Sequence, residues 1–442
     1  MNKTQPARGM RDFLPIDVRR REYVIGVIRE VYESYGFEPL ETPAIENLET
    51  LTGKYGEEGG QLMFKILKRG EKLDISAGEK GLSDLALRYD LTVPLARVVA
   101  NYRNDLPKFF KRYQIQPVWR ADRPARGRYR EFYQCDVDAI GSKSMIVEAE
   151  LISAVSEILQ RLGFDDFVIK LNHRNLLFDI LERANIPTEK QADAVTAIDK
   201  LDKLSVEQVS NELINKGITE SSTAYVMNLY KEVAQVWNQG IDVNEILLST
   251  ILGGELEIRE QLIKIINLVG NSRIAIYPFL ARGLSYYTGT IMEINVPDLA
   301  GSLGGGGRYD ELIGMFGKEQ IPACGFSLGL ERILVVMEER GMFPEDLQNT
   351  SADVMVTIWN EESAGESLKL ANELRKEGLR VLVYPEADKL GKQFKYASQV
   401  GVSFVCVMGE SELAENKVTL KNMRSGEQET LSRAEIAAKI KV

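Results

Sequence analysis

The sequence predicts a mixed α/β fold, of the α+β kind in its main domain, with a second, smaller α/β domain after it. Three observations support this prediction. Strand and helix patterns mix over residues 1–170 and again over 273–340, the block 171–272 is helix-rich and glycine-poor, and residues 353–442 alternate strand and helix patterns. The helical block is therefore expected to be an insertion in one domain, and the polar, proline-bearing stretch 341–352 to be a linker.

The first elements follow in chain order. Gly36 is expected to end a helix whose apolar residues recur at helical spacing: Val24, Val27, Ile28, Val31 and Tyr35. The segment "EPLETPAIEN" is predicted to be extended and broken by its prolines. Next, "ALRYDLTVPLARVVANY" indicates a strand that enters a helix. The segments "RYQIQPVWRADR" and "RYREFYQCDVDAIG" indicate two strands around a turn that holds "RPARG".

The later elements complete the two domains. A helix is expected near 144–162, followed by the strand "DDFVIKLNH". Strand patterns return at 273–296, and then come the predicted turn "GGGGRYDELIG" and the segment "ACGFSLGLERILVVMEE". In the last domain, "ADVMVTIW", a helix, "RVLVYPE", a second helix and "VSFVCVMGE" predict a β-α-β-α-β order.

Composition is that of a globular protein. Hydrophobic residues make up 44% and charged residues 27% of the 442 residues, and no apolar run reaches the ~20 residues of a membrane-spanning helix. The N-terminal residues lack the apolar stretch of a secretory signal, so we expect a cytoplasmic protein without membrane contact. The net charge of −10 disfavours general attraction to a polyanion, so any nucleic-acid contact must depend on local basic patches.

Cysteine and histidine are scarce, which excludes several kinds of site. The three cysteines, Cys135, Cys324 and Cys406, are widely spaced, which argues against a disulfide framework and a cysteine-based zinc site. The single histidine, His173, excludes histidine-rich metal sites. It lies where a strand is expected to give way to a helix, and a hydrogen-bonded residue at a strand end is the favoured interpretation. An enzyme of this composition would act mainly through binding and electrostatics.

The densest functional signal is "VWRADRPARGRYREFYQCDVD". One or two arginines on an exposed turn need no explanation, but five beside a Pro/Gly turn predict an anion site, because guanidinium groups are bidentate donors that stay protonated. The same loop could contact a nucleic-acid backbone. The five lie within eleven residues: Arg120, Arg123, Arg126, Arg128 and Arg130.

Three further segments are weaker signals. Asp90 and Thr92 have the same-side spacing of a strand and would suit a ligand ammonium group, although Asp-x-Thr is more often a helix cap. The run "GGGGRYD" could bind phosphate through backbone N–H groups or could be a flexible hairpin loop, and it matches neither common nucleotide fingerprint. Arg332 is expected early in a helix, where a surface arginine is the ordinary alternative.

The segment "ARGLSYYTG" raises a question of charge. Arg282 precedes the strand-like run "TIMEINV" and lies close to Tyr286 and Tyr287. A charged side chain at the entrance of a sheet requires an anionic partner, which the rest of the sequence has to supply.

Taken together, these segments resemble the class II aminoacyl-tRNA synthetases. "GFEPLETPAIE", "VWRADRPARGRYREFYQCDVDAIG" and "GFSLGLERIL" resemble their motifs 1, 2 and 3. "ARGLSYYTGTIMEI" and "GGGGRYDELI" are similar to two signatures of the histidyl-tRNA synthetase family, and "RYDLTVP" and "GRYREFYQCD" resemble its eukaryotic-like branch more than the enterobacterial one. The resemblance spans essentially the whole chain. It implies a mixed antiparallel-sheet class II synthetase domain with a helical insertion and a C-terminal α/β anticodon-binding domain.

The resemblance also implies an activity and its substrates. Histidine would be activated with ATP, taken with Mg²⁺, to histidyl-adenylate and pyrophosphate, and would then pass to the 3′ end of tRNA(His). It implies a homodimer with motif 1 at the interface, no zinc and no organic cofactor. The alternative is a non-catalytic paralogue that regulates histidine biosynthesis or binds RNA.

The site residues carry over by similarity. Arg120 and Arg282 would be catalytic, with Arg120 on the α-phosphate and Arg282 on the histidine carboxylate and the α-phosphate. The other ATP-binding residues would be Asp122, Arg128, Phe132 and Arg332. The histidine-binding residues, besides Arg282, would be Asp90, Thr92, Gln134, Asp138, Tyr286 and Tyr287.

The C-terminal domain contains a cluster of lysines, and two residues elsewhere depart from the family pattern. Lys389, Lys392 and Lys395 have helical spacing, which often marks a solvated face, but the resemblance favours an anticodon-contacting helix. Ser285 replaces the usual acidic residue before the tyrosine pair, and Asp122 replaces the glutamate of the broader class II pattern.

Overall fold

The computed structural model describes residues 4–201, 204–238, 256–270, 273–283, 286–317, 319–344, 347, 350 and 352–441. The chain forms two compact units. One consists of the residues up to Asp12 together with Arg21–Met342, and the other of Phe13–Arg20 together with Phe343–Val442. The helix α1 (Pro15–Ser34) crosses this division, and Gly36 follows it with a φ of +75°, as a helix stop requires.

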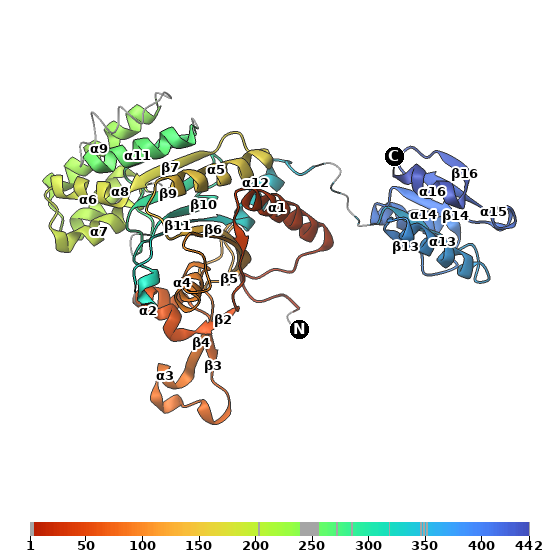
Figure 1. The fold of residues 1–442 in the computed structure, drawn as a ribbon, viewed down its shortest axis with the longest axis horizontal. Helices are drawn as coiled ribbons and strands as arrows, with labels where there is room; N and C mark the ends of the chain where they lie inside the picture. Colours follow the sequence, from red (N-terminus) through yellow and green to blue (C-terminus); the bar gives the residue numbers. More distant parts are fainter. Residues whose placement is uncertain are drawn as a thin grey trace. The chain divides into compact units, whose positions relative to one another are not determined.

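An eight-stranded sheet forms the centre of the larger unit (Figure 1). The strand order is β1 (Glu38–Pro39), β5 (Phe110–Trp119), β6 (Glu131–Ile140), β11 (Ala323–Gly329), β10 (Gly304–Arg308), β9 (Thr290–Asn295), β7 (Val168–His173) and β8 (Ile274–Ile276). The pairs are antiparallel except β1 with β5 and β7 with β8. This order places β6 beside β11, so segments from both parts of the predicted main domain share one sheet.

Helices cover the sheet and bury its apolar residues. α5 (Ile146–Arg161) and α12 (Leu330–Glu339) pack against β6, and α5 also contacts β11. The apolar face of α5 is fully buried through residues such as Leu151, Ile152 and Ile158. The helix expected near 144–162 and the two strands around "RPARG" are confirmed by α5 and by the β5–β6 pair.

A small three-stranded sheet precedes β5. Its order is β2 (Ile45–Asn47), β4 (Ser83–Leu87), β3 (Lys65–Leu67). It is accompanied by α2 (Leu48–Leu62), α3 (Glu79–Leu82) and two 3₁₀ helices, Gly70–Lys72 and Ile75–Ala77. The strand that was expected to enter a helix is confirmed, since β4 is followed by α4 (Thr92–Asn101).

The helical block lies between β7 and β8 in sequence. Its described helices are α6 (Arg174–Arg183), α7 (Thr188–Ile198), α8 (Val206–Asn215), α9 (Glu220–Asn238) and α11 (Leu256–Val269). Figure 1 shows them as the yellow-green to green group beyond the β7 end of the sheet. α11 packs against α5 and β7, so the block is anchored to the sheet at its end.

The predicted turn "GGGGRYDELIG" is wrong at its glycines. Gly304–Arg308 forms β10, which pairs with β9 on one side and β11 on the other. A Cβ on Gly306 would lie 2.2 Å from the backbone oxygen of Gly325 and 2.7 Å from the ring of Phe326. Because the neighbouring strands approach so closely, glycine is required here for packing and not for a turn.

The C-terminal unit is an α/β domain with a mixed sheet. The order is β13 (Val381–Val383), β12 (Val354–Val356), β14 (Phe404–Val407), β15 (Lys417–Asn422) and β16 (Gln428–Ser432), with the first three parallel. Its helices are α13 (Ala364–Lys376), α14 (Leu390–Val400), α15 (Glu410–Glu415) and α16 (Arg433–Ile440). The β-α-β-α-β order is confirmed, and the β15–β16 hairpin adds to it.

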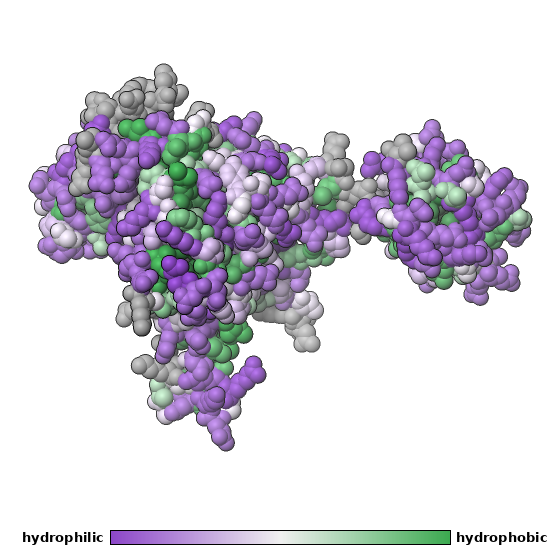
Figure 2. All heavy atoms as spheres, viewed as in Figure 1, coloured by the Kyte–Doolittle hydropathy of each residue, from purple (hydrophilic) through white to green (hydrophobic). Residues whose placement is uncertain are grey.

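The surface agrees with the composition. Hydrophilic residues predominate on the face of each unit that Figure 2 shows. Among the helices of the described residues, none combines the length and the apolar character needed to cross a membrane.

Candidate active site

A cavity of about 610 Å³ opens on the central sheet of the larger unit. Its walls come from α4 and the residue stretch before it, the β5–β6 hairpin, the loop after β8, β10, β11 and the first turn of α12. Twelve residues singled out from the sequence line this one cavity: Asp90, Thr92, Arg120, Asp122, Arg128, Phe132, Gln134, Asp138, Arg282, Tyr286, Tyr287 and Arg332. Residues nearly 250 positions apart in sequence therefore meet at a single site.

Four arginines line the cavity: Arg120, Arg128, Arg282 and Arg332. Arg120 donates from Nε to the Tyr89 carbonyl at 3.0 Å, and its guanidinium lies 5.3 Å from the centre of the Phe132 ring. Arg332 donates to the Ser302 carbonyl at 2.5 Å. Burial lowers the pKa of Arg332, and the positive charges of Arg282 and Arg128 act in the same direction. Such crowding of like charges favours an anionic ligand.

The arginines of the turn between β5 and β6 fall into two groups, those that line the cavity and those that bind other parts of the protein. Arg120 and Arg128 line the cavity, where Arg128 pairs with Asp122 at 2.6 Å. Arg126 instead pairs with Glu339, its Nε lying 2.9 Å from Glu339 Oε1. Arg130 donates to the Asp122 carbonyl at 3.1 Å. Part of the signal read as an anion site is therefore structural, because some of these arginines hold the turn in place.

Asp90 caps a helix, which is the common role of an Asp-x-Thr sequence. Its Oδ1 accepts from the backbone N–H of Val93 at 3.0 Å, and Thr92 is the first residue of α4. The strand spacing expected for Asp90 and Thr92 is therefore wrong, because the chain turns into the helix between them. Both residues still line the cavity.

Carboxylates and phenols lie at the other side of the cavity. Asp138, in β6, is an ion-pair partner of the fully buried Arg112 at 2.8 Å and accepts a hydrogen bond from the hydroxyl of Tyr309. The Tyr286 and Tyr287 rings pack together with centroids 4.2 Å apart, and burial raises the pKa of Tyr286. The region thus presents fixed acceptors and neutral hydroxyls, which suit a polar ring.

Gln134 and Asp136 share the cavity-facing side of β6 with Asp138. Gln134 donates to Ser327 Oγ at 3.0 Å. Burial raises the pKa of Asp136 to about 7, the negative charge of Asp138 acts in the same direction, and the positive charge of Arg112 opposes both. Asp136 was not singled out as a site residue, although its alternation with Gln134 and Asp138 along the strand could have revealed it.

Arg282 has a resident partner that the sequence analysis did not anticipate. It forms an ion pair with the carboxylate of Glu293, whose side chain is 1% exposed in β9. The expectation that a substrate supplies the anion for Arg282 is therefore incomplete, because the protein provides one itself. The departure at Ser285 lies outside the described residues.

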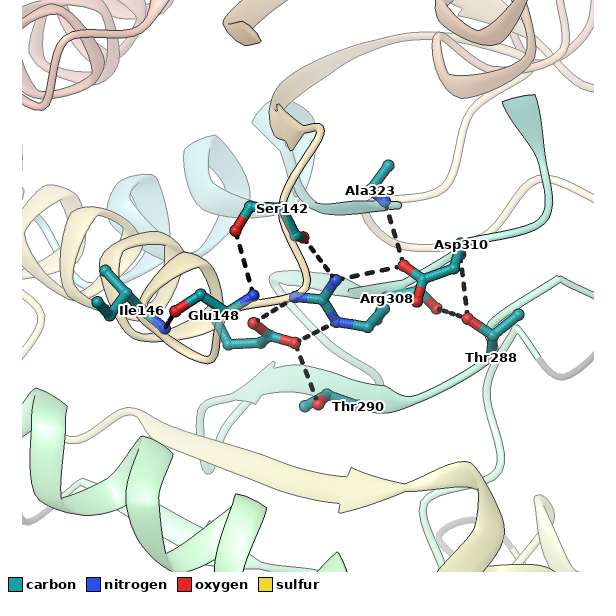
Figure 3. Close-up of polar contacts among 9 residues, drawn as sticks. Ser142, Ile146, Glu148, Thr288, Thr290, Arg308, Asp310 and Ala323 are labelled. Carbon is teal, nitrogen blue, oxygen red and sulfur yellow. Dashed lines mark hydrogen bonds and ion pairs between the residues drawn. The ribbon is translucent and has the colours of Figure 1, made fainter. Parts of the chain in front are cut away.

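Arg308, in the glycine-run signature, pairs with the fully buried Glu148 of α5 (Figure 3). Its Nε and Nη2 lie 2.6 and 2.7 Å from the two Glu148 oxygens, and Nη1 lies 3.2 Å from Asp310. Asp310 in turn accepts from the backbone of Ala323 at 3.2 Å. Sequence reasoning missed this network, because its partners are far apart in the chain.

His173 is confirmed as a hydrogen-bonded residue at a strand end. It is the last residue of β7, it is 7% exposed, and its Nδ1 accepts from the N–H of Asn175 at 3.2 Å to cap α6. Burial lowers its pKa to about 4, and the positive charge of Arg308 acts in the same direction. Among the described residues, no group of three or more His, Cys, Asp or Glu side chains could hold a metal ion.

The three lysines lie in the C-terminal unit. Lys389 is the residue before α14, and Lys392 and Lys395 are exposed in its first two turns. Lys392 pairs with Asp388 at 2.9 Å.

The sheet is mainly antiparallel, and its β5–β6 hairpin and the helix α12, which follows β11, each place an arginine in one cavity. This arrangement is that of a class II aminoacyl-tRNA synthetase. The family model of histidyl-tRNA synthetase matches residues 9–333, and that of the anticodon binding domain matches residues 353–442. The chain belongs to the histidyl-tRNA synthetase family.

Relatives agree along the full length. A histidine–tRNA ligase of Porphyromonas gingivalis is 42% identical, with 98% of this chain and 97% of that protein covered. One of Gloeobacter violaceus is 41% identical, with 96% and 95% covered. The crystal structure of histidyl-tRNA synthetase from Nostoc sp. PCC 7120 has a TM-score of 0.80 and 32% identity, and 100% of this chain and 99% of that chain are covered.

Proposed function

We propose that this chain activates histidine with ATP to histidyl-adenylate and pyrophosphate and then transfers the histidyl group to the 3′ end of tRNA(His). The observation that supports this best is the single cavity in which Arg120, Arg282 and Arg332 lie with the acceptors of β6 and the tyrosine pair. Full-length relatives that are named histidine–tRNA ligases support the same activity.

The nucleotide binds at the arginine-rich end. ATP is taken as its Mg²⁺ complex, with adenine between Phe132 and Arg332, and with Asp122 and Arg128 on the rest of the nucleotide. A guanidinium is a good partner for both an aromatic ring and a phosphate, and it stays charged at all working pH values.

Histidine binds at the carboxylate end. Asp90, Thr92 and Gln134 receive its ammonium group, and Asp138 and Tyr287, beside Tyr286, receive its imidazole. Asp138 is held by Arg112 and Tyr309, so its acceptor positions are fixed before the ligand arrives. An amino acid that cannot pair with these buried groups leaves them unsatisfied, and such sites discriminate by about 10⁴–10⁵.

The chemistry requires charge neutralisation and no general base. The histidine carboxylate attacks the α-phosphorus of ATP, the bond to the β-phosphate oxygen breaks, and pyrophosphate leaves. Arg120 and Arg282 stabilise the negative charge on the α-phosphate oxygens in the transition state. The terminal ribose 3′-hydroxyl of the tRNA then attacks the carbonyl carbon of histidyl-adenylate, its proton passes to a phosphate oxygen of the departing nucleotide, and AMP leaves. The protein acts in the cytoplasm as a homodimer.

Amino-acid-dependent ATP–pyrophosphate exchange tests this function. We expect exchange with histidine alone among the twenty amino acids. Arg282→Ala should lower it by about 10²–10³-fold, which is the usual cost of removing a transition-state donor. Arg126→Ala is the matched control, because Arg126 lies on the same turn as Arg120 but pairs with Glu339. Folded protein without exchange for any amino acid would instead favour a non-catalytic regulatory or RNA-binding paralogue.

A further inference from the structure

Glu293 is the acidic residue of an otherwise uncharged strand. β9 has the sequence "TIMEIN", and its first five residues are buried. The Glu293 side chain is 1% exposed and pairs with Arg282, whose side chain is 39% exposed. A buried carboxylate is costly unless a charge compensates it, so its presence at this position calls for a reason beyond packing.

The neighbouring strands leave room for this pair. Glu293 is in register with Gly305 of β10 on one side and with Lys170 of β7 on the other. Gly305 has no side chain, and a Cβ there would meet only the Met292 oxygen, at 3.3 Å, so β10 does not crowd this position. Arg282 approaches from the loop after β8 and lines this cavity and also a second one, of about 230 Å³, which Glu293 lines too. The guanidinium of Arg282 therefore lies at the boundary between the two cavities.

The pair still leaves donors on Arg282. The closest atoms of the ion pair are Arg282 Nε and Glu293 Oε2. A guanidinium carries five N–H groups, so one that pairs with a carboxylate can also donate to a second anion. Arg282 can therefore keep its resident partner while it contacts a substrate carboxylate or phosphate.

Glu293 also balances the arginine cluster. Burial lowers the pKa of Arg332, the charges of Arg282, Arg128 and Arg120 lower it further, and the charge of Glu293 raises it. Loss of the Glu293 charge should therefore increase the repulsion between Arg282 and the other arginines when the cavity holds no substrate.

We propose that Glu293 is a positioning residue for the activation step, whose carboxylate holds Arg282 at the cavity through their ion pair before the substrate anions bind. This inference rests on the proposed function. Glu293 touches no substrate in it and acts through Arg282. Preorganised donors stabilise a transition state without reorganisation during the reaction, so loss of Glu293 should affect turnover more than binding.

A double-mutant cycle on histidine-dependent ATP–pyrophosphate exchange tests the proposal. Glu293→Gln keeps the shape and removes the charge, and we expect kcat to fall by about 10–100-fold, as for a misplaced catalytic group. The KM values for ATP and histidine should stay within about threefold. In the Arg282→Ala background, Glu293→Gln should lower kcat by less than about threefold, because residues that act as a unit are not additive.

Glu212→Gln is the control. Glu212 is a partly buried carboxylate that pairs with Lys200 at 2.6 Å, and it does not line the cavity. It should change kcat by less than about threefold in either background, since independent sites combine additively in free energy. Circular dichroism and thermal unfolding verify that each variant is folded. Should Glu293→Gln fail to fold, Glu293→Asp, which keeps the charge and shortens the side chain by one methylene, replaces it in the cycle.

Two results would overturn the inference. One is a kcat for Glu293→Gln close to that of the unchanged protein. The other is a fall that is equally large with and without Arg282, which would mark a structural role. In both cases the unchanged protein still shows exchange with histidine, so the proposed function stands. Absence of that exchange would overturn the proposed function and this inference together.

Discussion

Arg112 and Asp138 lie on adjacent strands at directly opposed positions, with Arg112 Nη2 2.8 Å from Asp138 Oδ2. Both side chains are almost completely shielded from solvent. The pair places a fixed carboxylate in the wall of the cavity where the imidazole of histidine is proposed to bind.

Loss of Arg112 should destabilise the fold. Arg112→Met leaves Asp138 without its charge partner, and breaking a buried pair in this way costs about 3–5 kcal/mol in the free energy of unfolding. Chemical denaturation measures this. Lys111→Met is the control, because the adjacent Lys111 has a partly exposed pair with Glu150 and should cost less than about 1 kcal/mol. Equal costs for the two variants would contradict the prediction.

The pair of Arg308 and Glu148 predicts a different result when both partners are changed. Arg308→Met alone should cost about 3–5 kcal/mol in unfolding free energy, because Glu148 stays buried without its partner. The double variant Arg308→Met with Glu148→Leu should recover most of this loss, since apolar replacement of a whole buried pair is often nearly neutral. If the double variant instead loses as much unfolding free energy in urea as the two single variants together, the prediction is wrong. The hydrogen bonds of Arg308 to Asp310 and Ser142 would then contribute more stability than the pair with Glu148.

His173 should make stability depend on pH. Its folded pKa of about 4 lies below the ordinary value of 6.5, so the unfolded state binds the proton more tightly. Stability is therefore fully present above about pH 6.5 and is lost as the pH falls toward 4, by about 3 kcal/mol in total. His173→Asn keeps a helix-capping acceptor without the titration. The loss of unfolding free energy between pH 7.5 and 4 should be about 3 kcal/mol smaller in this variant.

Asp136 makes an opposite contribution to the pH dependence of stability, and comparing His173→Asn with the unchanged protein removes it. The raised pKa of Asp136 means that the folded state binds that proton more tightly, so acidification from about pH 7 stabilises the protein through Asp136. Asp136 is present in both proteins, and its contribution cancels in the difference. Identical pH profiles for the two proteins would contradict the assignment of a buried, neutral His173.

Adjacent glycines of β10 should differ in their tolerance of a methyl group. Gly306→Ala would place Cβ 2.2 Å from the Gly325 oxygen, whereas Gly305→Ala meets the Met292 oxygen at 3.3 Å. We expect Gly306→Ala to lose about 1–3 kcal/mol of stability, as overpacked sites do, and to lose exchange activity with it. Gly305→Ala should be clearly milder. Thermal unfolding and exchange assays on the two variants would refute the prediction if Gly305→Ala were the more damaging.

The lysines of α14 should affect tRNA and not amino-acid activation. Replacing Lys389, Lys392 and Lys395 by Gln should raise the KM for tRNA(His) in aminoacylation by about tenfold, or about 1.4 kcal/mol. ATP–pyrophosphate exchange should be unchanged. Lys417→Gln with Lys439→Gln changes charge elsewhere in the same unit and is the control. A similar rise in the control would indicate a general charge effect in place of a contact surface.

Local patterns predicted much of the fold. The β5–β6 strands alternate around a Pro/Gly turn, and α5 has helical periodicity, so short-range rules were sufficient for both. The same rules failed at Gly304–Gly307, because a glycine run is typical of a turn when only neighbours in sequence are considered. The close approach of β9 and β11 that makes glycine necessary there is a tertiary contact.

The sequence by itself determined which residue types this protein could use. With one histidine and scattered cysteines, it pointed to arginines, carboxylates and phenols, and its motifs marked twelve of the residues that line the cavity. Tertiary structure alone decided how the charges pair: Arg282 with Glu293, Arg308 with Glu148 and Arg112 with Asp138. The physical reason is that an ion pair depends on a separation of a few ångströms in space, and the sheet sets that separation by aligning strands that lie far apart in the chain.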